Sequence, residues 1–383
     1  MNLRQISSTQ FALLVFVCGM AIKMFMLPAL MLKVSGRDSI VVMAFYLVIE
    51  LVNVVFLTLT LKRNPDKTFY EILSSALGKI VAKIIVTYFT LFLLLKLLLM
   101  LSELKVFFSS SVYERISWDI MIIPILVLCV GFSTKPLTSL GRVAELFSPL
   151  ILISTVILSL LLSAKVPIQN IFPLFDNGIK SVVDGALTFP VWFGDVSLLL
   201  VCLGNVKLSK KIVLKTLLLR GLSVLFALTF SLIMFSTYAD ITELIDYGHN
   251  VSSMTQYSLG SHDYGRFDYI IYCFWMLAVI IKIMLNFYTV SQNVRYVVGK
   301  NAQYVIPIVV AIIVYVLTTF VLKNENATYQ LSTSALKFVF VPAEFLLPFI
   351  TFILAKIKFR KAEEIQKERE VNNGEKTDEK GMA

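Results

Sequence analysis

Long apolar runs separated by short polar segments dominate the sequence. A membrane-spanning helix requires about 20 mostly apolar residues, and ten runs reach or approach this length. They lie at residues 9–33, 39–61, 79–105, 118–134, 145–164, 181–204, 212–238, 267–292, 303–322 and 335–357. The fourth run is short, and the sixth is interrupted by polar residues and helix breakers. The pattern predicts an all-α integral membrane protein with about ten transmembrane helices.

Composition agrees with a membrane protein and argues against a soluble one. Hydrophobic residues make up 57% of the 383 residues and charged residues only 16%, whereas soluble chains are about one quarter charged. The first run is too long for a cleavable signal peptide and is expected to remain as the first span. The cysteines lie in apolar runs without a CxxC pair, and we expect ordinary packing residues there. They are Cys18, Cys129, Cys202 and Cys273.

The distribution of Lys and Arg over the loops predicts the orientation. An even number of spans places both termini on one side, and the loops of that side carry about twice as many cations as the opposite loops. By the positive-inside rule, both termini are cytoplasmic. The net charge of +10 is therefore a topology signal, and nucleic acid is not expected as a partner. Residues 358–383 are dense in Lys and Glu, which predicts a disordered cytoplasmic tail after a transmembrane domain at 1–357.

The longest outer loop, 239–266, holds both histidines of the chain. His249 and His262 lie thirteen residues apart in polar sequence, where surface residues are more common than metal ligands. Asn250 and Asn326 match the N-glycosylation pattern, which carries no information in a bacterial chain. The sequence predicts no metal site and no cofactor.

The first span contains two helix breakers and a charge. In FALLVFVCGMAIKMFMLPALM, Gly19 and Pro28 bracket a stretch that holds Lys23. Proline frees carbonyls of the preceding turn, and glycine lowers the cost of leaving the helix. A lysine at the bilayer centre costs at least about 2.5 kcal/mol, so it must face a cavity or a partner. The alternative is a simple kink with a lysine that reaches toward the membrane surface.

The sixth span is interrupted in a similar way. In SVVDGALTFPVWFGDVSLLLVCLG, Pro190 and Gly194 mark a break and Asp195 follows it. The alternative is a kinked or re-entrant helix in which Asp195 only hydrogen-bonds to backbone.

The two breaks fall in spans one and six of ten. Transporters built from two inverted five-helix repeats have broken helices at these positions, and their substrate site lies between them at the midplane. We therefore predict a five-plus-five inverted repeat with helices one and six broken. We also expect the charged groups of Lys23 and Asp195 to face one cavity. The predicted substrate-binding residues are Gly19, Ala21, Ile22, Lys23, Phe189, Pro190, Phe193 and Asp195.

Other charged residues fall within the predicted spans. Glu50, Lys96, Lys282 and Glu344 lie deep, whereas Glu103, Glu145, Arg220 and Lys337 are expected nearer the membrane surfaces. Glu50 and Lys282 are candidates for an ion-coupling or a structural role. In the first case, the Lys282 ammonium replaces a sodium ion and couples protons. In the second, it pairs with Glu50 or Glu344 for structure.

Several segments together resemble the spore germination permeases. They include ISSTQFALLVF leading to MLPALML, TFYEILSSALGKIVAKII after span two, and SLGRVAELFSPLI entering span five. They also include NIFPLFDNGIKSVVDGAL before span six and the basic NVKLSKK loop after it. The resemblance covers nearly the whole chain. These permeases are the B subunits of germinant receptors and relatives of the amino acid–polyamine–organocation transporters.

The resemblance implies a ten-helix inverted-repeat protein of the spore inner membrane. It implies a receptor subunit that acts with A-type and C-type subunits, binds a small amino-acid-like nutrient and helps to trigger germination. In family members the break of helix one usually holds small residues, whereas this chain has Lys23 there. Its ammonium either neutralises Asp195 or meets a substrate carboxylate, and both would change ligand preference.

A second function fits the same sequence features. A proton- or sodium-coupled amino acid transporter would share the fold, and fold alone does not decide function. An enzyme is not expected, because no Ser-His-Asp, HExxH, P-loop or GxGxxG pattern occurs in a usable context.

Overall fold

The computed structural model describes residues 5–21, 23, 27–111, 117–163, 169, 172–175, 178–238, 268–299, 302–320, 330, 333–334 and 336–357. Several sequence predictions fall on positions outside the described residues. These are Ile22, His249, Asn250, His262, Asn326 and the tail at 358–383.

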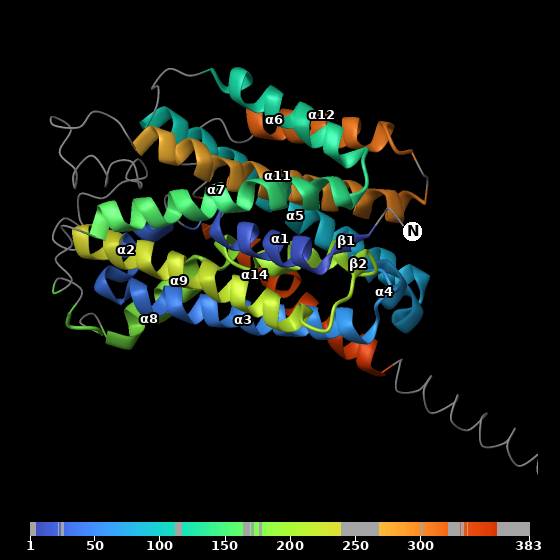
Figure 1. Cartoon of the computed structure of the whole chain (residues 1–383), viewed down its shortest axis with the longest axis horizontal. Coiled ribbons are helices and arrows are strands. Elements are labelled where there is room, and N and C mark those ends of the chain that lie inside the picture. Colours follow the sequence, from blue (N-terminus) through green and yellow to red (C-terminus); the bar gives the residue numbers. More distant parts are fainter. Residues whose placement is uncertain are drawn as a thin grey trace, which may run out of the picture.

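Helices make up nearly all of the described chain (Figure 1). The first half contains β1 (Ile6–Ser7), α1 (Ser8–Met20), α2 (Leu27–Ser35), η1 (Gly36–Asp38), α3 (Ser39–Arg63), α4 (Phe69–Leu77), α5 (Lys79–Ser111), α6 (Trp118–Ser133) and α7 (Leu137–Ser163). The second half contains α8 (Gly178–Thr188), η3 (Pro190–Trp192), η4 (Asp195–Cys202), β2 (Val206–Lys207), α9 (Ile212–Tyr238), α11 (Asp268–Val298), α12 (Val305–Phe320), α14 (Leu336–Val341) and η6 (Pro342–Leu346), which continues as helix to residue 357.

Six helices of the described chain are long and apolar enough to cross a membrane. They are Leu27–Arg63, Lys79–Ser110, Leu137–Ser163, Ile212–Tyr238, Tyr272–Val298 and Lys337–Ile357. Three further apolar helices are shorter, namely Ser8–Met20, Trp118–Ser133 and Val305–Phe320. The chain is therefore an all-α, multi-pass membrane protein. The helix that corresponds to the fifth predicted span begins earlier than expected, at Leu137. Its first turns include the charged residues Arg142 and Glu145, which the helix tolerates because both side chains are exposed.

The first predicted break is present. A capping box starts α1, in which the Ser7 hydroxyl accepts from the Gln10 backbone N–H at 3.1 Å. The helix ends at Met20, and Ala21 is extended with φ −64° and ψ 140°. The next helix, α2, begins at Leu27 with Pro28 in its first turn, where a missing N–H costs nothing. The break thus begins two residues after Gly19, which itself remains helical.

The second predicted break separates α8 from η4. After α8, the chain forms the short η3, and Gly194 then takes a left-handed conformation with φ 70°. The eight residues of η4 form a 3-10 helix and are all buried. Helices one and six are therefore both discontinuous, as predicted.

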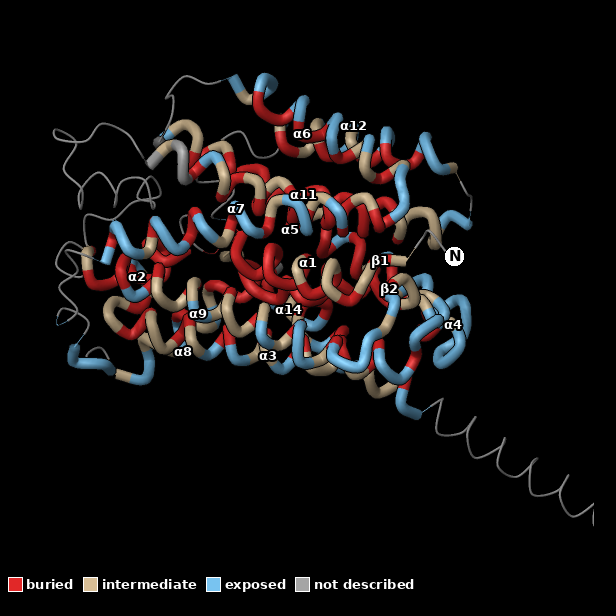
Figure 2. Tube along the Cα trace, viewed as in Figure 1, coloured by how far each residue is buried: buried red, intermediate tan, exposed pale blue. Residues whose placement is uncertain are grey.

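Helix α1 and η4 lie in the interior of the molecule, whereas α8, the first part of helix six, lies at its edge (Figure 2). Helix α1 packs against α9, α7 and α11, and η4 contacts α1, α3 and α11. Helices α6 and α12 pair at one edge (Figure 1). A two-residue parallel pair, β1 with β2, links the start of α1 to the chain after η4, and Ile6 N–H donates to Asn205 O at 2.8 Å. This pair ties the two broken helices together at one end.

Candidate functional site

Seven ionisable side chains meet where the two broken helices approach each other. They come from the first break, α3, α5, η4, α9, α11 and η6, and each is at most 3% exposed. They are Lys23, Glu50, Lys96, Asp195, Arg220, Lys282 and Glu344. We refer to these seven residues as the charge cluster. Charges removed from water in this way are stable only when they are paired, and each member has an opposite charge within ion-pair distance.

Asp195 lies at the centre of the charge cluster. Its carboxylate is 2.9 Å from Lys23 Nζ, 3.1 Å from Lys96 Nζ and 2.7 Å from Lys282 Nζ. Three ammonium groups from three different elements therefore converge on the first residue of η4. This carboxylate holds the second break against the first break, α5 and α11.

Glu50 on α3 forms the second anionic centre. Its carboxylate contacts Lys23 Nζ at 2.5 Å and accepts from the Arg220 guanidinium of α9. It also accepts from the Asp195 backbone N–H at 3.3 Å. Lys23 bridges Glu50 and Asp195, so the contacts around the first break are continuous with those around the second.

Each break has a carbonyl that accepts from a lysine of the opposite half. Lys282 of α11 donates to Ala21 O in the first break at 3.4 Å. Lys96 of α5 donates to Phe193 O in the second break. Both α5 and α11 are the third helix of their half, and both lysines also contact Asp195. The carbonyls that the breaks release from the helices are thus capped by tethered cations.

Two glycines make room for the charge cluster. A Cβ atom at Gly19 would lie 1.8 Å from Arg220 Nη1, and one at Gly194 would lie 1.8 Å from Glu344 Cγ. The absence of a side chain at Gly19 therefore leaves space beside α1 for the Arg220 guanidinium. Gly194 supplies both the left-handed turn and the space for Glu344.

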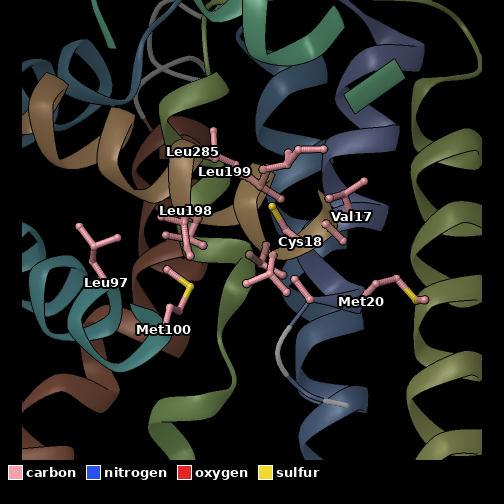
Figure 3. Close-up of a cluster of buried hydrophobic side chains, with 14 of the residues drawn as sticks. Val17, Cys18, Met20, Leu97, Met100, Leu198, Leu199 and Leu285 are labelled. Carbon is pink, nitrogen blue, oxygen red and sulfur yellow. The ribbon is translucent and has the colours of Figure 1, made fainter. Parts of the chain in front are cut away.

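Aromatic and apolar side chains enclose the charges. The Phe193 ring stacks on Tyr46 with centroids 4.3 Å apart, and Lys23 Nζ lies 5.3 Å from the Phe193 centroid. Phe189 is buried, and Pro190 lines an apolar groove of about 540 Å³ beside Tyr46 and Phe345. Figure 3 shows Val17, Cys18 and Met20 of α1 near apolar residues of α5, η4 and α11, the same elements that carry the charges.

The charge cluster has four cationic and three anionic side chains, so its formal charge is one positive. A bound anionic group would balance it. Among the described residues, no group of three or more His, Cys, Asp or Glu side chains is placed to hold a metal ion. The arrangement is suited to binding a small anion or the anionic end of a zwitterion.

The structure brings together four residues that the sequence singled out. Lys23, Asp195, Glu50 and Lys282 all belong to the charge cluster, and the first two are in direct contact, as their position beside the breaks predicted. Lys282 pairs with Asp195 rather than with Glu50 or Glu344. The cavity expected between Lys23 and Asp195 remains a prediction.

Two charges that the sequence placed nearer the membrane surfaces are buried inside the protein. Arg220 lies only two turns into α9, yet it is 1% exposed and pairs with Glu50. Glu103 on α5 is 2% exposed and accepts from Trp192 Nε1 of η3. The position of a charge along a helix can be read from the sequence. The direction in which its side chain points depends on how the helices pack, and this could not be predicted. The small residue Gly19, opposite Arg220, was the one available signal.

An all-α membrane fold with two broken helices around buried charges defines a permease-like protein. The chain belongs to the spore germination protein family, whose model matches residues 5–328. Among curated proteins, none matches the sequence.

Solved structures of the same fold come from a manganese transporter of Eremococcus coleocola. A histidine-to-alanine mutant of that transporter aligns with a TM-score of 0.58 at 8% identity, covering 91% of this chain and 84% of the transporter. A complex of it with an aromatic bis-isothiourea substituted compound aligns with a TM-score of 0.53 at the same identity and coverage. These similarities establish the fold.

Proposed function

We propose that the protein is the nutrient-binding membrane subunit of a germinant receptor. It binds a small amino-acid-like nutrient between the two helix breaks and acts with A-type and C-type subunits in the spore inner membrane, with both termini in the cytoplasm. The observation that carries this proposal is the surplus positive charge of the charge cluster, placed where the two broken helices meet. Membership of the spore germination protein family supports the same function.

The charge cluster favours a ligand with a carboxylate. Ammonium and guanidinium groups form strong charge-assisted hydrogen bonds with carboxylates, and in a buried site these bonds are little screened. The same cations would repel a divalent metal ion. We therefore infer that the manganese transported by the structural neighbours is not the ligand of this chain.

A coupled amino acid transporter is the second candidate, because the fold is that of solved transporters. In such transporters, carbonyls released by a broken helix coordinate the coupling sodium ion. Here the Lys282 ammonium lies on Ala21 O, where it takes the place of a free cation. Lys282 would then act as the proton-coupling group, while Glu50 would hold Lys23 and Arg220 in place.

Replacement of Lys23 tests the binding role. In Lys23→Met, Glu50 keeps Arg220, and Asp195 keeps Lys96 and Lys282, so the fold should persist while the surplus charge disappears. We expect the nutrient concentration for half-maximal germination to rise by about tenfold or more, which corresponds to about 1.4 kcal/mol of lost binding free energy. The measurement is a germination dose response against a panel of amino acids, with the amount of protein in the spore membrane determined by immunoblot.

Lys33→Met provides the matched control, because Lys33 is exposed on α2 and should leave the dose response unchanged. An unaltered dose response in Lys23→Met would contradict the binding role. Vesicles containing the protein alone distinguish the two functions. Gradient-driven accumulation of a radiolabelled amino acid would replace the receptor proposal with the transporter.

A further inference from the structure

Glu103 is a buried carboxylate that the charge cluster does not include. It lies on α5, is 2% exposed, and accepts from Trp192 Nε1 through Oε1. Its second oxygen, Oε2, is buried and has no hydrogen-bond partner within the described residues. Glu103 also forms no ion pair with any residue of that part of the chain. One of its two oxygens is therefore available to a ligand.

This situation differs from that of the other buried carboxylates at the site. Glu50, Asp195 and Glu344 each have at least one cation within 4.0 Å. An ionised carboxylate in an apolar interior is strongly destabilised unless it is paired with a cation or saturated with donors. A single indole N–H leaves Glu103 short of donors. The site would be completed by a cationic donor on Oε2.

Glu103 and Lys96 present opposite charges to neighbouring points of the second break. The two residues are seven positions apart on α5, so they lie on one face, about 10 Å apart along the axis. Glu103 contacts Trp192, and Lys96 contacts the carbonyl of Phe193, the next residue. Consecutive Cα atoms are about 3.8 Å apart. The two opposite charges therefore contact adjacent residues of the second break.

We propose that Glu103 accepts the ammonium group of a zwitterionic ligand whose carboxylate balances the surplus cation of the charge cluster. This inference rests on the proposed nutrient-binding function and specifies the ligand as an amino acid with both charges free. Met100 lies between Lys96 and Glu103 on α5 and is buried among apolar neighbours (Figure 3). Its flexible thioether is suited to moving aside and packing against the side chain of the ligand.

Paired ligands test this role in purified full-length protein. The probes are L-alanine, L-valine and L-asparagine, each compared with the acid that lacks the ammonium group: propionate, 3-methylbutyrate and succinamate. Binding is measured by the shift of the thermal unfolding midpoint with ligand concentration. We expect wild-type protein to bind at least one amino acid about tenfold or more tightly than its partner acid. In Glu103→Gln, this preference should fall to about twofold or less.

Two further variants separate ligand contact from structure. Trp192→Phe removes the indole donor but keeps the carboxylate, so the preference for the amino acid should persist. Glu145→Gln removes a carboxylate of α7 that is exposed and bonded to Gln10, and it should change neither affinity. If Glu103→Gln does not fold, Glu103→Asp keeps the charge and should keep the preference.

The outcomes distinguish this inference from the proposed function. Equal affinity of wild-type protein for amino acids and partner acids would overturn the role of Glu103 and leave carboxylate binding in place. A full preference retained in Glu103→Gln would also overturn it. If neither class of compound shifts the unfolding midpoint of the wild-type protein, the proposed binding function itself fails.

Discussion

Gly19 and its neighbour across the helix interface, Arg220, show how single residues set the geometry of the site. The absence of a side chain at Gly19 lets the guanidinium of α9 reach between the helices to Glu50. Removing one partner of a buried ion pair costs about 3–5 kcal/mol, because the remaining charge stays buried without compensation. Small residues at helix contacts are also what allows membrane helices to approach closely. The geometry of the charge cluster therefore depends on a residue that has no side chain.

Gly19→Ala is expected to destabilise the protein by about 3 kcal/mol, since the new methyl group must displace Arg220 and break its ion pair with Glu50. The matched control is Gly221→Ala in α9, directly after Arg220, where a Cβ atom meets nothing within 4 Å. That change should be neutral or stabilise by up to about 1 kcal/mol, because alanine is the better helix former. The measurement is the free energy of unfolding in a denaturing detergent titration. Equal effects of the two substitutions would show that Arg220 does not need the gap.

In the break of helix six, Gly194 meets two structural requirements, a left-handed backbone and space for a neighbouring side chain. The residue has φ 70°, a left-handed conformation that L-residues with a side chain rarely adopt. Its missing side chain also leaves room for Glu344 of η6, which contacts Lys96 at 3.4 Å. Backbone shape and charge placement are therefore coupled at this one element. The coupling explains why glycine occupies position 194.

Comparing Gly194→Ala with Gly299→Ala separates the energetic cost of the left-handed backbone from the cost of displacing Glu344. Gly299 has nearly the same conformation, φ 72°, but a Cβ atom there meets nothing within 4 Å. We expect Gly299→Ala to cost about 1–2 kcal/mol of unfolding free energy from the backbone alone. Gly194→Ala should lower the free energy of unfolding by about 3 kcal/mol more than Gly299→Ala does, because Glu344 must also leave Lys96. Comparable losses in the two variants would mean that Glu344 moves aside freely.

At the scale of the whole molecule, corresponding helices of the two halves pack against each other. The second helices α3 and α9 are in contact, as are the third helices α5 and α11 and the fourth helices α6 and α12. The broken elements α1 and η4 meet in the same way. Such pairing is the arrangement expected of two repeats related by a pseudo-two-fold axis. It explains why the two lysines of α5 and α11 reach the breaks of opposite halves.

The sequence allowed the apolar helices and both breaks to be predicted, because length, hydropathy, Pro, Gly and charge are local signals. Lys23 and Asp195 followed from those breaks. The neighbours of these residues could not be predicted, because which face of a helix points inward depends on contacts between distant segments. Arg220 and Glu103 illustrate this limit. The β1–β2 pair illustrates it as well, since two strands of two residues have no periodicity to detect.

Whether the sixth segment crosses the membrane or re-enters it is decided by labelling on its two sides. At about 1.5 Å per residue in α8 and about 2 Å per residue in η4, each piece is about 16 Å long, and the two together exceed a hydrocarbon core of about 30 Å. Leu174, before α8, and Lys210, after η4, are both exposed.

We expect Leu174→Cys to react with an impermeant maleimide in intact cells and Lys210→Cys to react only after permeabilisation, since the basic loop at 207–215 is expected to be cytoplasmic. Cys273, the one native cysteine of the described chain that is exposed, is first replaced by serine to remove background labelling. Labelling of both positions from the same side would identify segment six as re-entrant and place the C-terminal half in the opposite orientation. Labelling from opposite sides would instead show that segment six crosses the membrane, with the second break between its two ends.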